Sequence, residues 1–199
     1  MSDFIDISTT IFSKKIVDFG EIKLRYLNLN EDIETIYNWV TKPYAKYWGM
    51  QNMTLEEVKN SYKDFEGSTH YEVIIGMYEN KPIFLMEKYK ASEDRIANYY
   101  EVKNGDYGMH ILVGPTTKKI PSFTWNIFTT ILDYFFSKTA VSRIVVEPDV
   151  NNQKIHVLNK KAGFQYKKEI ELPEKKAALA FCDRRQYKQA YTAQKKEKG

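Results

Sequence analysis

The stretch GMHILVGPTTKKIPSFTWNIF, residues 108–128, carries the local pattern that decides the predicted fold. Its first part is an apolar strand that contains His110, and its last part is the start of a helix. The turn between them holds two lysines, Lys118 and Lys119, among several hydroxyl side chains. A helix N-terminus presents unpaired backbone N–H groups and a partial positive charge, so this strand–turn–helix unit is able to bind a phosphate. The stretch alone leaves open an alternative, an ordinary surface loop with Ser122 as the helix cap.

The rest of the chain predicts a mixed α/β order of elements. Helices are expected at 30–41, 54–65, 92–100, 122–136 and 152–164. Strands are expected at 21–29, in a hairpin at 70–89 around the turn ENKP, through His110, and at 143–148, 164–172 and 176–184.

Local signals define several helix ends. Asn30 is a candidate cap of the first helix, and Thr54 with Glu57 forms a capping-box pattern at the second. Gly163 is a natural C-terminal stop for the helix that begins near 152. The helix over 122–136 is expected to bury one face made of Trp125, Phe128, Leu132 and either Phe135 or Phe136.

Length and composition suit one domain, expected over 1–187, with a basic and frayed tail at 188–199. The formal charge of +4 lies partly in that tail, so a nucleic-acid partner is not indicated. The single cysteine, Cys182, excludes an internal disulfide framework and is expected to be buried and inert. There is no apolar run of the ~20 residues that a bilayer requires and no secretory-signal pattern, so a cytoplasmic protein without a membrane partner is expected.

The segment VVEPDVNNQKIHVLNKKAGF, residues 145–164, resembles a conserved block of the GCN5-related N-acetyltransferase (GNAT) superfamily. The likeness rests on a strand, then Asn152, then Gly163-Phe164 at the helix end. The resemblance implies an α/β fold: a single GNAT-like domain with a mixed, mostly antiparallel twisted sheet, helices on both faces, and a splayed strand pair that binds acyl-CoA. It implies acetyl-CoA or another acyl-CoA as co-substrate and no metal, with coenzyme A contacts from Ile111, Leu112, Val113, Lys118, Lys119, Ser122, Phe123, Thr124 and Asn152.

Two positions depart from that family's pattern. The usual glycine-rich R/Q-x-x-G-x-G/A loop is replaced by TKKIPS, so phosphate contacts would rely more on side chains. The tyrosine that often serves as general acid, seven residues after the asparagine, is Asn159 here. Because an amide cannot protonate a thiolate in the same way, the leaving group needs another proton source.

A narrower resemblance links GDYGMHILVG and VVEPDVNN, with YAKYWGM and FLMEKYKASEDRIANYY before them, to the siderophore hydroxamate acyltransferases. It covers roughly residues 20–185. Those enzymes transfer an acyl group from acyl-CoA to the hydroxylamine nitrogen of an N-hydroxylated lysine, ornithine or diamine. The resemblance places His110 and Asp149 at catalytic positions and Trp48, Glu87 and Tyr89 in substrate-side segments.

The chemistry of these residue types suits that reaction. An alkylhydroxylamine is largely neutral near pH 7 and needs a base only as its nitrogen attacks the thioester, a task for which neutral imidazole is suited. His110 is therefore the expected general base, and Asp149 is expected to orient it or to hold the N–OH group. The residues also allow Glu147 as the functional acid, Asp149 as a helix cap, and His110 as a packing residue.

Other functions remain open at this level. Aminoglycoside 6′-N-acetylation is the nearest alternative enzyme activity, and a non-catalytic acyl-CoA-binding module is another. A polycationic substrate needs a carboxylate-lined pocket, but basic residues stand among the candidate acids, namely Lys88, Lys90 and Arg95. The expected partners are an N-hydroxyamine and acyl-CoA, with acetyl as the default acyl group, and the chain is expected to be a monomer or homodimer.

Overall fold

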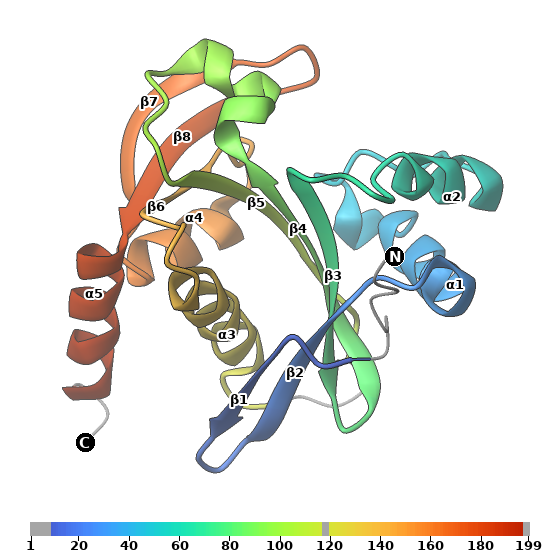
Figure 1. The fold of residues 1–199 in the computed structure, drawn as a ribbon, viewed down its shortest axis with the longest axis horizontal. Coiled ribbons are helices and arrows are strands. Elements are labelled where there is room, and N and C mark those ends of the chain that lie inside the picture. The colour runs from blue at the N-terminus through green and yellow to red at the C-terminus, as the bar shows by residue number, and fades with distance from the viewer. Residues whose placement is uncertain (1–8, 117–119, 197–199) are drawn as a thin grey trace, which may run out of the picture. The chain divides into compact units, whose positions relative to one another are not determined.

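The computed structural model describes residues 9–116 and 120–196 and is shown in Figure 1. The strands are β1 Phe12–Ile16, β2 Gly20–Tyr26, β3 Tyr71–Tyr78, β4 Lys81–Lys90, β5 Asp106–Val113, β6 Arg143–Val146, β7 Gln165–Glu171 and β8 Lys176–Asp183. The α-helices are α1 Leu29–Val40, α2 Leu55–Lys63, α3 Phe123–Ser137, α4 Gln153–Lys161 and α5 Arg184–Lys196. Three 3₁₀ segments complete the described elements: η1 Pro43–Ala45, η2 Ala91–Glu93 and η3 Arg95–Tyr99.

The strands form an eight-stranded sheet in the order β1-β2-β3-β4-β5-β6-β8-β7. Strands β5 and β6 are parallel, whereas β1 with β2, β2 with β3, β6 with β8, and β7 with β8 are antiparallel. The mixed, mostly antiparallel α/β fold predicted from the sequence is therefore confirmed. Among the described residues, none of the helices is both long and apolar enough to cross a bilayer.

The chain divides into two compact units, each built from two stretches of sequence. In the described residues, the first unit contains the chain up to Lys88 together with His110–Thr130. The second contains Tyr89–Met109 and the chain from Ile131 onward. Strands β4 and β5 and helix α3 contribute residues to both units.

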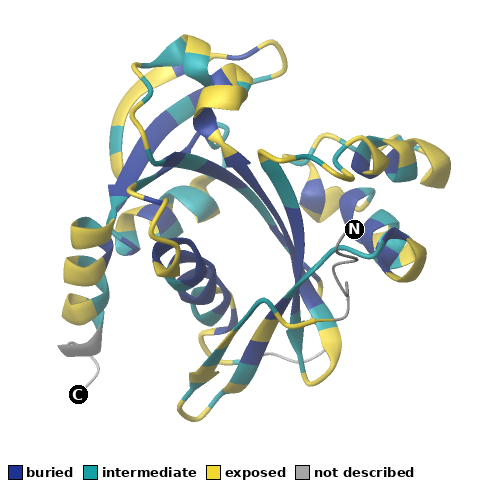
Figure 2. Cartoon of the chain, viewed as in Figure 1, coloured by how far each residue is buried: buried dark blue, intermediate teal, exposed yellow. Residues whose placement is uncertain are grey.

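The first unit has a core formed by α1, α2 and the strands. Ile36 and Val40 of α1 and Val58 of α2 are fully buried and belong to one cluster with Ile75 and Leu85. Figure 2 shows the matching exposed residues on the outer sides of these helices. An amphipathic helix is stabilised chiefly by burying such a stripe, so the helical spacing in the sequence is the reason these segments pack here.

The ends of the first helices have identifiable causes. Helix α1 begins at Leu29 because Asn28 is its N-cap: the Asn28 side chain accepts a hydrogen bond from the Asn30 backbone N–H at 3.1 Å. The predicted cap, Asn30, is therefore wrong, and the preceding strand ends at Tyr26 rather than at 29. The capping box of α2, with Thr54 and Glu57, is confirmed.

Several predicted elements of the second half differ in detail. The helix expected over 92–100 is instead the two 3₁₀ segments η2 and η3. Within the predicted helix over 122–136, which runs over Phe123–Ser137, Phe128, Leu132 and Phe135 are buried, but Trp125 is only half-buried.

The C-terminal segment expected to be frayed is helical. Helix α5 runs to Lys196, and its Tyr187 is buried and donates a hydrogen bond to Asp133 at 2.7 Å. Gly163 adopts a φ of 98° after α4, as expected for a C-terminal glycine. A Cβ at this position would lie 2.7 Å from the Gln186 carbonyl oxygen, so glycine also allows α5 to approach. Cys182 is fully buried, and burial raises the pKa of its thiol to about 12, which fits the inert role expected for it.

A buried ion pair supports the parallel start of β5 and β6 in the second unit. The Asp106 carboxylate accepts hydrogen bonds from Arg143 Nε and Nη2 at 2.8 and 2.6 Å. It also accepts from the Tyr100 hydroxyl at 3.1 Å and the Lys103 backbone N–H at 2.9 Å. Since Asp106 is 2% exposed, removing its charge leaves Arg143 without its main partner.

We expect Asp106→Asn to lower the free energy of unfolding by about 3 kcal/mol, measured by urea denaturation. The matched control is Glu174→Gln, which breaks the exposed pair with Arg95 in the same unit. That change should cost less than about 1 kcal/mol, because exposed ion pairs contribute little. Equal effects of the two variants would contradict a special role for the buried pair.

Candidate active site

A hydrogen-bonded cluster in the first unit is centred on a buried carboxylate. Glu87 lies on β4 and is 7% exposed. Its Oε2 atom is 2.9 Å from Nδ1 of His110, which lies on β5, the neighbouring strand in the sheet. The side chain of His110 is 36% exposed, so the imidazole bridges the buried carboxylate and the solvent-accessible side of the unit.

Three more aromatic residues join this cluster from other elements. The Tyr71 hydroxyl, on β3, donates a hydrogen bond to the same Glu87 Oε2 at 2.8 Å. The hydroxyl of Tyr62, on α2, accepts a hydrogen bond from Trp48 Nε1 at 3.0 Å. Burial, followed by the negative charge of Glu87, raises the pKa of Tyr62, so this phenol stays neutral.

Aromatic rings hold these groups in place. The ring of Tyr71 stacks on Phe65, with centroids 3.9 Å apart and an angle of 9° between the planes. The ring of Trp48 lies edge-on to the His110 imidazole, with centroids 6.4 Å apart. The result is an aromatic wall around one carboxylate and one imidazole, a setting that restricts rotation of both polar groups.

The structure brings together three of the residues predicted for the site: Trp48, Glu87 and His110. Sequence reasoning missed Tyr71 and Tyr62, which it assigned only to a strand and a helix. Their role depends on which residues face one another across β3 and β4 and on how α2 packs, and no local motif encodes either. The sequence signal available was an aromatic residue next to a strand start, which is common in any core.

Tyr89, the third predicted substrate-side residue, belongs to the second unit. It is 1% exposed, and its hydroxyl donates to Glu147 Oε2 at 3.1 Å. Its ring occupies the space beside Gly108, where a Cβ atom would lie 2.0 Å from Tyr89 Cε2. Gly108, two residues before His110, therefore has a packing role, since a larger residue would displace this ring.

Glu147 and Asp149, the two acids on either side of Pro148, both have partners within the second unit. Glu147 is 6% exposed, and besides Tyr89 it lies 3.7 Å from Lys175 Nζ. Asp149 Oδ1 accepts a hydrogen bond from the Asn151 backbone N–H at 2.7 Å, which forms a turn before α4. His110 and Asp149 fall in different units, so their catalytic pairing stays a prediction.

Asn159, at the position where the family often has a tyrosine, is buried at 1% exposure. Its side-chain N–H donates to the Tyr166 hydroxyl at 3.0 Å, and that oxygen is 2.7 Å from His156 Nδ1. His156 Nε2 donates to the Asp149 backbone carbonyl at 3.0 Å. Asn159 and His156 thus tie α4 to β7 and to the turn before the helix.

The predicted coenzyme A segment is described only in part. Strands β5 and β6 pair over three residues, Asp106–Gly108 with Arg143–Val145, after which β5 continues to Val113 while β6 ends at Val146. Lys118 and Lys119 lie outside the described residues.

The other predicted contact residues occupy strand and helix positions. Leu112 and Phe123 are buried, Ile111 and Val113 are half-buried, and Thr124 and Ser122 are exposed. Ser122 directly precedes α3 and has a φ of 56°, a left-handed conformation that costs a non-glycine residue energy. Asn152 is the N-cap residue of α4, and its side chain makes no capping hydrogen bond within the described part of the chain.

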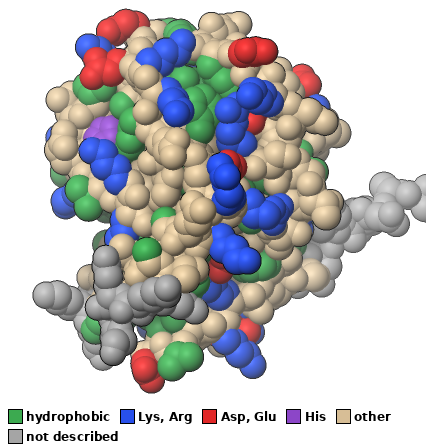
Figure 3. All heavy atoms as spheres, turned by 90° about the vertical axis from the view of Figure 1, so that its left-hand side faces the viewer, with side chains coloured by type: hydrophobic (Ala, Val, Ile, Leu, Met, Phe, Trp, Pro, Cys, Tyr) green, Lys and Arg blue, Asp and Glu red, His purple; other side chains and the backbone are tan. Residues whose placement is uncertain are grey.

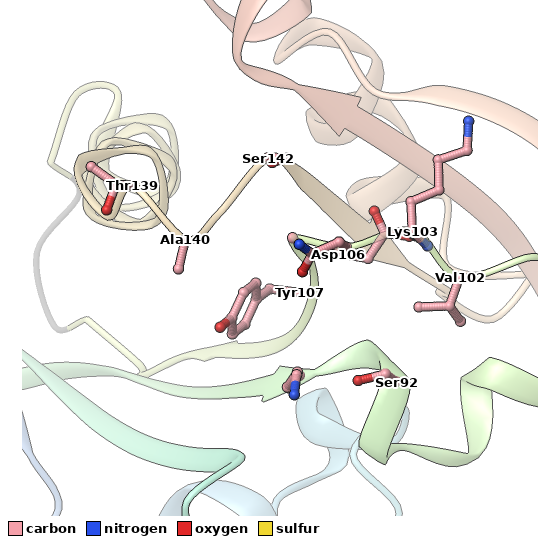
Figure 4. Close-up of a pocket in the computed structure, with 11 residues that line it drawn as sticks. Ser92, Val102, Lys103, Asp106, Tyr107, Thr139, Ala140 and Ser142 are labelled. Carbon is pink, nitrogen blue, oxygen red and sulfur yellow. Dashed lines mark hydrogen bonds between the residues drawn. The ribbon is translucent and has the colours of Figure 1, made fainter.

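A cavity of about 530 Å³ lies in the second unit, between the start of β5, the turn after α3, and η2. Figure 4 shows Tyr107, Thr139, Ser142 and Ser92 around it. Its acid, Asp106, is engaged by Arg143. Figure 3 shows several Lys and Arg side chains on the face that it draws.

Comparison with known proteins identifies related sequences. The family model described as an acetyltransferase (GNAT) domain matches residues 28–172. The chain is 28% identical over 158 residues to N(6)-hydroxylysine O-acetyltransferase of Escherichia coli, a match that covers 78% of this chain and 50% of that protein. It is 24% identical over 167 residues to N-hydroxyputrescine acetyltransferase of Acinetobacter baumannii, covering 83% of this chain and 79% of the relative. The chain spans about half the length of the first of these relatives.

Solved structures share the fold. An uncharacterized protein (bh2621) from Bacillus halodurans aligns with a TM-score of 0.82 and 27% identity, covering 90% of this chain and 92% of that one. The aminoglycoside acetyltransferase AAC(6')-Ib in complex with coenzyme A aligns with a TM-score of 0.74 and 19% identity, covering 84% of this chain and 98% of that one. The second likeness concerns the fold alone.

We expect Gly108→Ala to destabilise the protein by about 1–3 kcal/mol, because the added methyl group meets the buried Tyr89 ring. Thermal or urea unfolding measures the change. The double variant Gly108→Ala with Tyr89→Leu should cost less than the sum of the two single changes, since the smaller side chain leaves room for the methyl group. If the stability losses of the two single variants simply added up in the double variant, the contact between residue 108 and the Tyr89 ring would not be the cause of the destabilisation.

Proposed function

Because the chain belongs to the GNAT acetyltransferase family, we propose that it is an acyltransferase that moves an acyl group from acyl-CoA to the hydroxylamine nitrogen of an N-hydroxylated amine. The observation that carries this proposal is the half-exposed His110, held at Nδ1 by the buried Glu87. The relatives named for N(6)-hydroxylysine and N-hydroxyputrescine support an N-hydroxylated amine as the substrate, although the name of the first assigns acetylation to the oxygen. Acetyl is the default acyl group, and the product is a hydroxamate of the kind used in siderophores.

His110 is the general base of the proposed reaction. The neutral hydroxylamine nitrogen attacks the thioester carbonyl carbon, and a tetrahedral intermediate with an oxyanion forms. His110 takes the proton that the nitrogen loses, the C–S bond breaks, and coenzyme A leaves as a thiolate that is then protonated. An imidazole is suited to this step because its ordinary pKa lies near neutral pH, so it is largely unprotonated at physiological pH and still accepts a proton readily.

In the first unit, the end of β5 and the start of α3 provide the proposed site for coenzyme A. The pantetheine arm would lie along Ile111, Leu112 and Val113 of β5, and the pyrophosphate at the N-terminus of α3 with Ser122, Phe123 and Thr124. Lys118 and Lys119 would add positive charge, and Asn152 would contact the ligand from the start of α4. These residues bind and orient the co-substrate, while Asp149 holds the N–OH group.

Two features of the first unit disfavour the alternative activity, aminoglycoside acetylation. A polycation needs carboxylates that are available to pair with ammonium groups. The buried carboxylate of the His110 cluster is already bonded to Tyr71 and His110. The surrounding wall is aromatic and suits a neutral hydroxylamine group on an aliphatic chain better than a sugar with several ammonium groups.

The test is thiol release from acetyl-CoA with N6-hydroxylysine, N-hydroxyputrescine, lysine and kanamycin in parallel. We expect turnover of at least one hydroxylamine and not of lysine or kanamycin. Acylation of the hydroxylamine can occur at nitrogen or at oxygen. A colour reaction with ferric ion separates the two products, because an N-acyl hydroxamate chelates iron and an O-acyl hydroxylamine does not. Turnover of kanamycin alone would replace the proposal with the aminoglycoside activity.

In the same assay, His110→Ala should lower kcat by about 10²–10⁴-fold, the usual contribution of a positioned general base. The matched control is His70→Ala, because His70 is exposed and lies before β3. An unchanged kcat in His110→Ala would remove His110 from the base role while leaving the substrate class intact. Thermal unfolding of both variants checks that the fold is retained.

A further inference from the structure

We propose that Glu87 is the residue that positions His110: it accepts the Nδ1–H hydrogen bond and so makes Nε2 the nitrogen that takes the substrate proton. This inference rests on the proposed function, in which His110 is the base. It assigns to Glu87 a role different from the substrate contact expected from the sequence, and it gives the orienting role to a residue other than Asp149.

The hydrogen-bond inventory of the cluster determines the direction of the bond. An ionised carboxylate is an acceptor only, and Glu87 Oε2 receives the Tyr71 hydroxyl at 2.8 Å. The 2.9 Å contact to His110 Nδ1 is then an N–H donation from the imidazole. In a neutral imidazole one nitrogen carries the proton and the other carries the lone pair, so donation from Nδ1 leaves Nε2 as the base.

Rigid surroundings keep the carboxylate in this position. The Glu87 side chain is 9% exposed, and its Tyr71 partner is stacked on Phe65. Glu87 and His110 come from neighbouring strands, so the sheet pairing sets their separation rather than a mobile loop. A shift of either strand by one residue would turn one of these side chains to the opposite face of the sheet.

The negative charge of Glu87 also stabilises His110 after its Nε2 atom has accepted the substrate proton. When Nε2 accepts the proton, the imidazole becomes a cation with N–H groups at both nitrogens. A buried carboxylate beside Nδ1 stabilises that cation, because a charge pair interacts more strongly where water is largely excluded. Glu87 itself gains no proton: the proton goes from the hydroxylamine nitrogen to Nε2 and then to the thiolate or to water.

A substrate-binding role for Glu87 predicts a different outcome. If Glu87 held the amine substrate directly, its neutralisation would raise KM and leave kcat nearly unchanged. A positioning role predicts the reverse, a lower kcat with KM unchanged, because binding of either substrate does not depend on the imidazole tautomer. Kinetics of one variant therefore separate the two roles.

The first measurement is ¹⁵N NMR of the histidine-labelled protein, which reports the protonated nitrogen of each imidazole. The chain has three histidines, so the His110 signals are assigned by comparison with His110→Ala. We expect wild-type His110 to carry its proton on Nδ1 when neutral. A neutral His110 protonated on Nε2 would overturn the proposal without any need for a variant.

The second measurement uses Glu87→Gln, which keeps the shape of the side chain but supplies an amide N–H₂ donor. The amide oxygen can still accept the bonds from Nδ1–H and from Tyr71, but it carries no charge to stabilise the imidazolium, so kcat should fall by about 10²–10⁴-fold with KM unchanged. Glu72→Gln, which neutralises an acid of β3 paired with Lys88, is the matched control and should leave kcat and the His110 tautomer in place. An unchanged kcat in Glu87→Gln would overturn the proposal.

The two readouts separate this inference from the proposed function. If no hydroxylamine is acylated by the wild type, the proposed function fails, but the NMR result still decides whether Glu87 sets the tautomer. If turnover is found and kcat does not respond to Glu87→Gln, the inference alone fails. Glu87→Asp, which restores a carboxylate on a shorter side chain, should recover part of kcat.

Discussion

The need to satisfy one buried carboxylate, that of Glu87, organises the functional part of the first unit. A carboxylate at 7% exposure is costly unless hydrogen bonds replace its water. Tyr71 from β3 and His110 from β5 supply those bonds, and Tyr62 from α2 lies close enough for the charge of Glu87 to raise its pKa. These interactions fix three strands and one helix relative to one another within the unit. They also fix the orientation of the His110 imidazole.

Buried carboxylates in the second unit are also satisfied by hydrogen bonds. Asp106 accepts four hydrogen bonds where β5 begins. Glu147 accepts a hydrogen bond from the hydroxyl of Tyr89, whose ring packs against Gly108. The residues that make the sequence resemble an acyltransferase are therefore also residues that the fold needs. Their presence reflects packing as well as chemistry, so the functional argument depends on the geometry around His110 rather than on the motif alone.

Family membership and the geometry of the His110 cluster are independent observations, and both favour acyl transfer to an N-hydroxy amine. Family membership rests on the match over residues 28–172, and the relatives named for N-hydroxy amines suggest the nucleophile. The cluster adds a half-exposed histidine whose Nδ1 atom lies 2.9 Å from a buried carboxylate. A nucleophile that is neutral at physiological pH requires a base only during the attack, and the role proposed for His110 meets that requirement.

The sequence by itself determined the elements whose signals are local. The capping box at Thr54, the helical spacing of α3 and the glycine stop at Gly163 each depend on a few neighbouring residues, and all three were predicted. The tertiary structure alone decided that Tyr71 and Tyr62 surround Glu87, and that α5 is held in place by its buried Tyr187. Those outcomes depend on strand pairing and helix packing between residues distant in the chain, because burial and hydrogen bonding are set by neighbours in space and not by neighbours in sequence.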